Sequence, residues 1–159
     1  MSKDPSPLLA VEPGYKNVLR GRQLVTWVVV CVAAAVADQL LLDDTAFHGF
    51  PTTALPILAL ISLSTAPQRI YARLRYRLTD RFLQVLRGWL FHTDTIVPLV
   101  RVQHLDVTRG PLDKMFGTAT LVVHTAGTHN SIVTLPGLSP ERAAEIRDIV
   151  REHVRTDFA

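Results

Sequence analysis

Six histidines are the residues most directly suited to catalysis or metal binding, because imidazole is a common proton carrier and metal ligand. Four of them, His92, His104, His124 and His129, lie among the predicted strands of the charged second half of the chain. No pair has the spacing of a compact zinc motif, and the one cysteine, Cys31, lies elsewhere. His104 and His124 could meet across neighbouring strands, but such pairs usually form ordinary hydrogen bonds. We therefore expect no metal site and no cofactor.

Covalent catalysis and nucleotide binding also lack local support. No serine lies in a Gly-x-Ser-x-Gly turn. The glycines that would have to form a phosphate loop lie in separate turns, at Gly110, Gly117, Gly127 and Gly137. We predict that the protein is not an enzyme.

A row of arginines is the best candidate for a binding function. Arg73, Arg75 and Arg77 alternate with apolar residues over 71–78, a period typical of a half-buried strand. Arg81 follows in the next turn. These side chains either bind anionic lipid headgroups or mark membrane topology on a solvated strand face.

The turn from Gly110 to Gly117 is a second candidate. It contains three apolar side chains, Leu112, Met115 and Phe116, and Gly117 can end a short helical turn. The apolar side chains either bind a partner or dip into the membrane, or they pack inward.

Asp38 is a carboxylate inside an otherwise apolar stretch. An intramembrane carboxylate can gate ions or relay protons, which would suit a transporter or enzyme subunit. Asp43 and Asp44 follow closely, so an interfacial position at the outer end of a helix is the favoured interpretation.

The elements around these residues begin with two apolar segments, residues 24–42 and 46–66, which form a predicted transmembrane hairpin. Each has about the 20 residues that cross a bilayer, and Pro67 is expected to end the second. We predict a tail at 1–22, the hairpin at 23–67 and a folded domain at 68–159. Prolines and Gly14 indicate that the start of the tail is disordered or interfacial.

Basic residues set the expected orientation. Lys16, Arg20 and Arg22 precede the hairpin, several arginines follow it, and its loop contains none. The positive-inside rule then places both termini in the cytoplasm. The domain carries thirteen Lys and Arg against nine Asp and Glu, a balance that favours the anionic bilayer surface. No nucleic-acid motif is present, so nucleic acid is not an expected partner.

The second half is predicted to form an antiparallel sandwich or barrel closed by a helix. Ser139 and Pro140 are suited to start that helix, and Ala143, Ile146 and Val150 repeat on one face. Turn signals recur every few residues between short β-rich segments. The expected strands are 71–78, 82–87, 89–97, 100–108, 118–125 and 131–135.

Several segments resemble, in order, bacterial pleckstrin-homology-like (PH-like) membrane proteins of the YdbS type. The resemblance covers about residues 68–154, and the preceding helix pair matches the family's usual layout. The segments are YRLTDR at 76–81, IVPL at 96–99, RVQHLDV at 101–107, GPLDKMFG at 110–117, TLVVHTAG at 120–127 and LPGL at 135–138.

The resemblance implies an α+β membrane protein with about seven strands in two sheets, capped by the C-terminal helix. Such proteins are not known for an enzymatic active site, and they often occur beside a larger, multi-span relative. We therefore expect a bacterial inner-membrane protein with two spans, acting as a binding or scaffold subunit of a membrane complex that protects the cell envelope. Its expected partners are the bilayer and either that relative or a second copy. The alternatives are a sensor of anionic headgroups through Arg73, Arg75, Arg77 and Arg81, and a transporter or enzyme subunit that uses Asp38.

Overall fold

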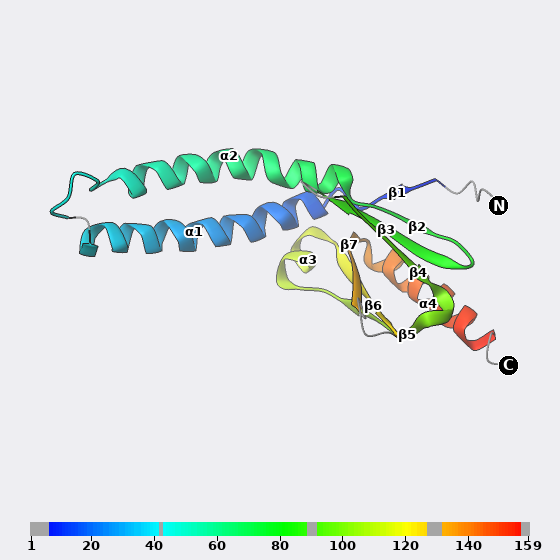
Figure 1. The fold of residues 1–159 in the computed structure, drawn as a ribbon. Helices are drawn as coiled ribbons and strands as arrows, with labels where there is room; N and C mark the ends of the chain where they lie inside the picture. The colour runs from blue at the N-terminus through cyan, green and yellow to red at the C-terminus, as the bar shows by residue number, and fades with distance from the viewer. Residues whose placement is uncertain (1–6, 42, 89–91, 127–131, 157–159) are drawn as a thin grey trace. The chain divides into compact units, whose positions relative to one another are not determined.

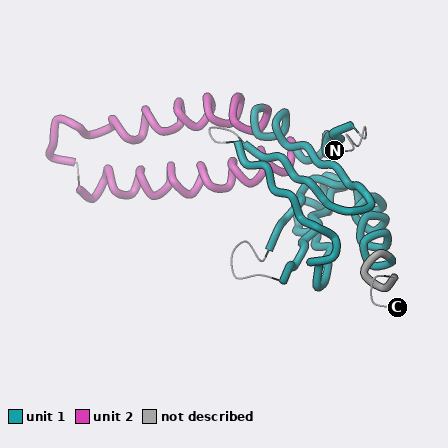
Figure 2. Tube along the Cα trace, turned by 45° about the vertical axis from the view of Figure 1, so that its right-hand side comes forward, with its two compact units in different colours: residues 1–15, 69–159 teal, residues 16–68 magenta. Residues whose placement is uncertain are grey.

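The computed structural model describes residues 7–41, 43–88, 92–126 and 132–156, without the side chains of 153–156. The chain divides into two compact units (Figure 2). One unit comprises residues 16–68, and the other combines the first fifteen residues with 69–159. The unit rich in strands is therefore built from two separate pieces of chain.

Two long helices form the first unit. These are α1 (Tyr15–Leu41) and α2 (Phe50–Arg73), which run antiparallel and side by side (Figure 1). Both are long and apolar enough to cross a bilayer, as the predicted hairpin requires. Gln23 on α1 donates a hydrogen bond to the Ser62 hydroxyl on α2.

The predicted end of the second helix at Pro67 is wrong. Pro56 and Pro67 both lie inside α2, which continues to Arg73. A proline removes only its own backbone donor, and later residues keep theirs, as Leu74 does in donating to the Ile70 carbonyl at 3.1 Å. The last turn of α2 therefore already belongs to the strand-rich unit.

The second unit contains two antiparallel sheets. One has the order β1-β2-β3-β4 and the other β5-β6-β7, so the predicted fold is confirmed. The strands are β1 (Leu9–Ala10), β2 (Arg75–Leu78), β3 (Phe82–Gly88), β4 (His92–Pro98), β5 (Val102–Thr108), β6 (Ala119–Thr125) and β7 (Ile132–Leu138). Predicted strand residues 89–91 and 131 lie outside the described residues.

Residues 9–11 of the tail are ordered, which corrects the expected disorder for this part of the chain. Leu9 pairs with Tyr76 and Ala10 with Arg75, so β1 is an edge strand beside β2. Val11 is only 3% exposed, and its carbonyl accepts a hydrogen bond from the Tyr71 hydroxyl at 3.1 Å. The two-residue strand is too short to show a period, so the sequence pattern did not reveal it.

A C-terminal helix closes the core as predicted. Helix α4 (Pro140–Thr156) is preceded by Ser139, whose hydroxyl accepts a hydrogen bond from the Arg142 amide. Ala143 and Ile146 are fully buried and Val150 almost so. They complete a single apolar cluster with residues of both sheets. Burial of this stripe, rather than helix propensity, holds α4 in place.

Candidate binding sites

The four predicted arginines do not form one row. Arg73 ends α2, Arg75 and Arg77 lie on β2, and Arg81 follows β2 in an exposed turn. The expected strand at 71–78 starts only at Arg75, because α2 extends through Arg73. A single lipid-binding strand face made of all four is therefore not what the structure forms.

Arg75 has a local structural role. Its guanidinium donates to the carbonyl of Leu74 at 3.0 Å and to that of Tyr71 at 3.4 Å. The last carbonyls of a helix lack intrahelical partners, and a cation at that end is favourable. Arg75 thus stabilises the end of α2 and is a poor candidate for headgroup recognition.

One predicted arginine, Arg73, lines a basic pocket. The pocket has a volume of about 270 Å³, and it is also lined by Arg87, His92 and Asp94. Burial lowers the pKa of Arg87, whose guanidinium donates to the Thr134 hydroxyl at 3.1 Å. Asp94 is held by Gln84 at 2.8 Å. Sequence reasoning missed Arg87 because the other residues of β3 are uncharged and so form no row of basic side chains with it.

The second predicted candidate forms helix α3 (Pro111–Phe116). Gly117 ends it in the left-handed conformation, at φ +66°, as predicted. Met115 is 74% exposed, while Leu112 and Phe116 are half-buried. Of the three apolar side chains of this turn, Met115 is exposed and the other two are partly covered, so binding of a partner or the membrane by the turn stays a prediction.

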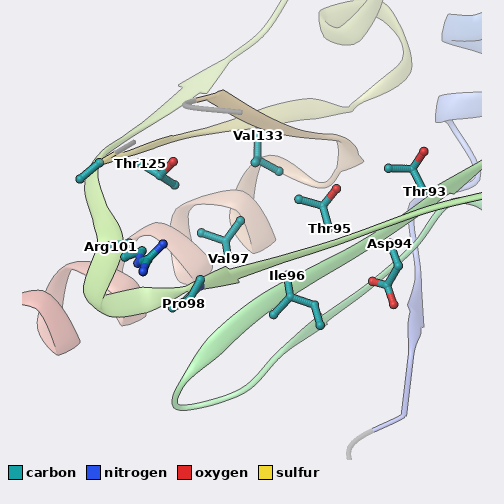
Figure 3. Close-up of a pocket in the computed structure, with 10 residues that line it drawn as sticks. Thr93, Asp94, Thr95, Ile96, Val97, Pro98, Arg101, Thr125 and Val133 are labelled. Carbon is teal, nitrogen blue, oxygen red and sulfur yellow. The ribbon is translucent and has the colours of Figure 1, made fainter. Parts of the chain in front are cut away.

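An open groove runs along β4, which sequence reasoning did not identify. Its volume is about 340 Å³. Thr95 and Val97 point toward Val133 of β7, whereas Asp94 and Ile96 point to the opposite face of the strand (Figure 3). Arg101 and Thr125 lie at one end. β4 is the last strand of its sheet, so this groove follows a sheet edge.

The backbone register shows which groups β4 offers at that edge. The Leu99 amide donates to the Arg81 carbonyl at 2.9 Å, and β3 and β4 pair in an unbroken register from Phe82↔Pro98 onward. Hydrogen-bonded and non-bonded pairs alternate in an antiparallel ladder. The amides of Asp94 and Ile96 therefore point away from β3. Pro98 falls at the same phase, where the absence of a donor costs no ladder bond.

Asp38 is buried at the far end of the hairpin rather than exposed there. It is 1% exposed, and its two carboxylate oxygens accept from the Gly49 amide at 3.0 and 3.1 Å. The Thr52 hydroxyl also donates to it, at 3.4 Å. These contacts join α1 to the start of α2, where free backbone amides favour an anion. The arrangement fits a structural tie better than a proton relay.

Among the predicted histidines, His104 and His124 do meet across strands, and they lie opposite each other in the β5–β6 register. Asp106 joins them on the same face. His92 lies on exposed β4 and lines the basic pocket. His129 lies outside the described residues.

Comparison with known proteins adds two similarities. A family model described as bacterial PH domain matches residues 24–154. The chain is 38% identical over 81 residues to the UPF0699 transmembrane protein YdbS of Bacillus subtilis (strain 168). That match covers 51% of this chain and 49% of the relative, so it spans about half of each. No solved structure gives a significant match.

Proposed function

This chain belongs to the bacterial PH domain family and is membrane-associated, and from that premise we propose that it is a non-enzymatic binding subunit of a membrane complex. The ligand is an extended segment of a partner polypeptide. It adds as a fifth strand beside β4. One observation carries this proposal: β4 is a sheet edge with outward-pointing amides, and a groove runs along it.

The chemistry of the edge favours a peptide over a compact ligand. The groove is lined by the consecutive residues from Thr93 to Pro98. It is therefore elongated along the strand, a shape that suits an extended peptide. Main-chain hydrogen bonds supply affinity in strand addition, and side-chain pockets supply specificity. Exposed edges that bind nothing are usually blocked by charge or by proline. Here proline stands only at the end of the strand, and the carboxylate of Asp94 within it accepts hydrogen bonds from Gln84 on β3.

The orientation that we propose has two spans, with both termini in the cytoplasm of a bacterial cell. The segregation of Lys and Arg to the two ends of the hairpin supports it. The partner strand is then cytoplasmic, and it belongs either to a larger multi-span PH-like relative or to a second copy of this chain.

Photo-crosslinking in native membranes tests the proposal. A photoreactive residue at Thr93 should give an adduct, and one at exposed Arg151 on α4 should not. Ile96→Pro removes an outward amide without breaking a bond to β3, so it should abolish the adduct. Ile96→Thr keeps the amide and should retain it.

A synthetic peptide covering the cross-linked segment should then bind the full-length protein and fail to bind the Ile96→Pro variant. Equal adducts from Thr93 and Arg151, or an Ile96→Pro variant that cross-links like the wild type, would overturn strand addition. A cross-linked segment from this same chain would identify the partner as a second copy.

A second candidate is recognition of anionic lipid headgroups in the basic pocket. Arg73, Arg87 and His92 line it, and Arg73 lies in the last turn of a helix that is apolar enough to span the bilayer. In nanodiscs, phosphatidylglycerol should slow amide exchange around Arg87 relative to phosphatidylcholine alone. Arg87→Gln should remove the difference, and Arg101→Gln should preserve it. No difference between the two lipids would exclude this candidate.

A further inference from the structure

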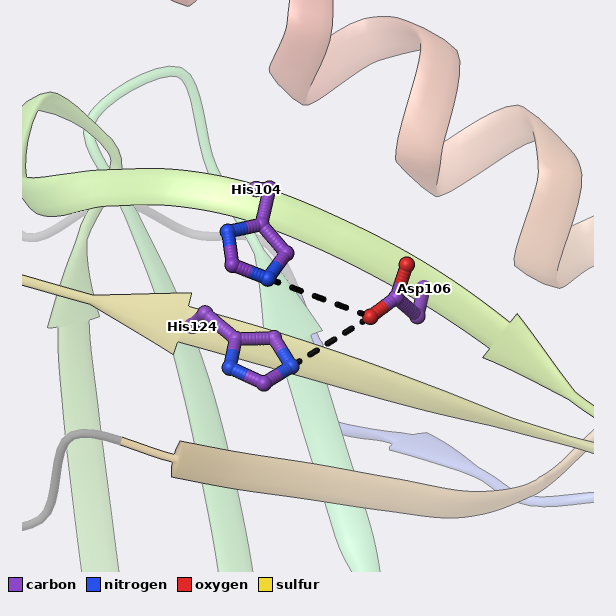
Figure 4. A group of neighbouring side chains, drawn as sticks. All are labelled: His104, Asp106 and His124. Atoms are coloured by element: carbon purple, nitrogen blue, oxygen red, sulfur yellow. Dashed lines mark ion pairs between the residues drawn. The ribbon is translucent and has the colours of Figure 1, made fainter.

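A cluster of two imidazoles and a carboxylate lies across two strands of the three-stranded sheet (Figure 4). His104 on β5 faces His124 on β6. Asp106 follows two residues after His104, so its side chain lies on the same face of the strand. Leu105, which lies between them, and Val107, which follows Asp106, pack against the core.

A register irregularity makes this cluster possible. It falls between Val102 and His104. Val102 is only 6% exposed, yet His104, at the same phase of a regular strand, is exposed. The extra residue lets Val102 enter the core while His104 stays on the outer face. Simple alternation places Val102 and His104 on one side, so it does not predict that Val102 is buried while His104 is exposed.

The three ligand atoms already converge. The Asp106 Oδ2 atom lies 3.3 Å from His124 Nε2 and 4.0 Å from His104 Nε2. The two rings are stacked, with centroids 4.0 Å apart and planes 15° apart. All three ligand atoms lie within 4.8 Å of one another. Nitrogen and oxygen atoms bound tetrahedrally at about 2.0–2.1 Å from zinc are themselves about 3.3 Å apart, so small side-chain rotations suffice.

Hydrogen bonding alone leaves this arrangement incomplete. The 3.3 Å contact is slightly long for a hydrogen bond, and the 4.0 Å contact is too long for one. Protonating both imidazoles would place two like charges in stacked rings, which is unfavourable. A divalent cation instead uses the nitrogen lone pairs of both neutral rings and the charge of the carboxylate.

We propose that His104, His124 and Asp106 bind a divalent transition-metal ion, with Zn²⁺ as the biological candidate. Two imidazole nitrogens and one carboxylate oxygen are a donor set suited to zinc, and three protein ligands leave a coordination position for water or a partner's side chain. The His104 and Asp106 side chains are 61% and 56% exposed, and His124 is 26% exposed. An ion therefore reaches the site directly from solvent.

Calorimetric titration of untagged full-length protein with zinc chloride tests this site. We expect one ion per chain. His104→Ala and His124→Ala should each weaken binding about tenfold or more, since changes to groups that merely support a metal ligand already cost that much. His92→Ala and His48→Ala are matched controls, and each should bind zinc like the wild type.

Copper supplies a readout that tests the site in the wild-type protein by itself. Cu²⁺ binds such donors more tightly than Zn²⁺, and its electron paramagnetic resonance spectrum resolves coupling to bound nitrogens. Wild-type protein should show two imidazole nitrogens, and each histidine variant one. A wild-type spectrum with fewer than two nitrogens, or zinc binding unchanged in both variants, would overturn the site.

Discussion

Asp38 illustrates how one residue's contacts decide between two functions. Both of its oxygens face the Gly49 amide, and His48 Nδ1 lies 3.9 Å away. In a proton relay, a carboxylate exchanges protons with neighbouring proton-carrying groups that form a path. This carboxylate instead accepts hydrogen bonds that tie the hairpin's connecting segment to α1.

We expect Asp38→Ala to loosen the start of α2. Hydrogen bonds to a charged acceptor contribute about 1.5–3 kcal/mol, so amide exchange at Gly49 should accelerate about tenfold or more. Asp38→Asn keeps a carbonyl acceptor and should have a smaller effect, and exposed Asp44→Ala should have none. Hydrogen-exchange mass spectrometry of the protein in nanodiscs measures all three. Unchanged exchange in Asp38→Ala would contradict the structural role.

Residue types were easier to predict than their neighbours. The sequence pointed to Asp38, to Arg73 and to a meeting of His104 with His124. It could not reveal that Asp38 binds a backbone amide or that Arg73 shares a pocket with Arg87. Those facts depend on where loops return, which local composition does not encode.

At the scale of elements, the junction between β7 and the start of α1 is tightly packed. Gly137 has φ +78°, and a Cβ at this position would lie 2.6 Å from the Tyr15 ring. Gly117 has φ +66° and no atom within 4 Å of its would-be Cβ. A substitution at Gly117 therefore introduces backbone strain alone, whereas one at Gly137 introduces backbone strain and steric overlap.

Gly137→Ala should destabilise the domain more than Gly117→Ala. Left-handed conformation costs a non-glycine residue about 1–2 kcal/mol, and this cost applies to both variants. Only Gly137→Ala must also displace Tyr15 from its place against the core. Denaturant unfolding followed by the fluorescence of the domain measures the difference. Equal losses of unfolding free energy in the two variants would show that displacing Tyr15 does not destabilise the domain.

Elements with clear periods were predicted well, and their ends were not. The strong stripe of α4 and the left-handed end of α3 follow from local chemistry. The extension of α2 past Pro67 and the pairing of β1 do not, because each is stabilised by contacts with residues distant in sequence. Tyr71 and Val11 provide one such contact.

At the scale of the whole molecule, the hairpin interrupts the PH-like domain. β1 precedes it and β2 follows it, yet the two are neighbours in one sheet. Chain 68–159, the domain expected from sequence, therefore lacks an edge strand and the buried Val11.

We expect residues 68–159 alone to have a free energy of unfolding about 2 kcal/mol or more below that of the domain with β1 and Val11. Burying a valine side chain contributes about 1.5–3 kcal/mol. A chain that joins residues 7–15 by a flexible linker to 69–159 should recover that stability. The same linked chain with Val11→Asp is the control, and it should not recover. Chemical denaturation compares the three.

If α1 and α2 span the membrane as proposed, the pairing of β1 with β2 requires the residues before α1 and after α2 to share one side of it. Single cysteines introduced in a Cys31→Ser background check this. A cysteine at Asp44 should react with an impermeant maleimide applied to intact cells. Cysteines at Glu12 and Asp80 should react only after lysis. Labelling of Glu12 or Asp80 in intact cells would contradict the proposed orientation.

The split sheet also imposes an order on biosynthesis. The ribosome makes β1 before α1 and α2, and β2 only after both helices. If only one of the two helices entered the bilayer, β1 and β2 would lie on opposite sides of the membrane, and the core would lack the side chain of Val11. In the proposed two-span arrangement, completion of the domain therefore depends on correct insertion. A chain that inserts wrongly is left with β2 as an unpaired sheet edge, a site for pairing with other chains.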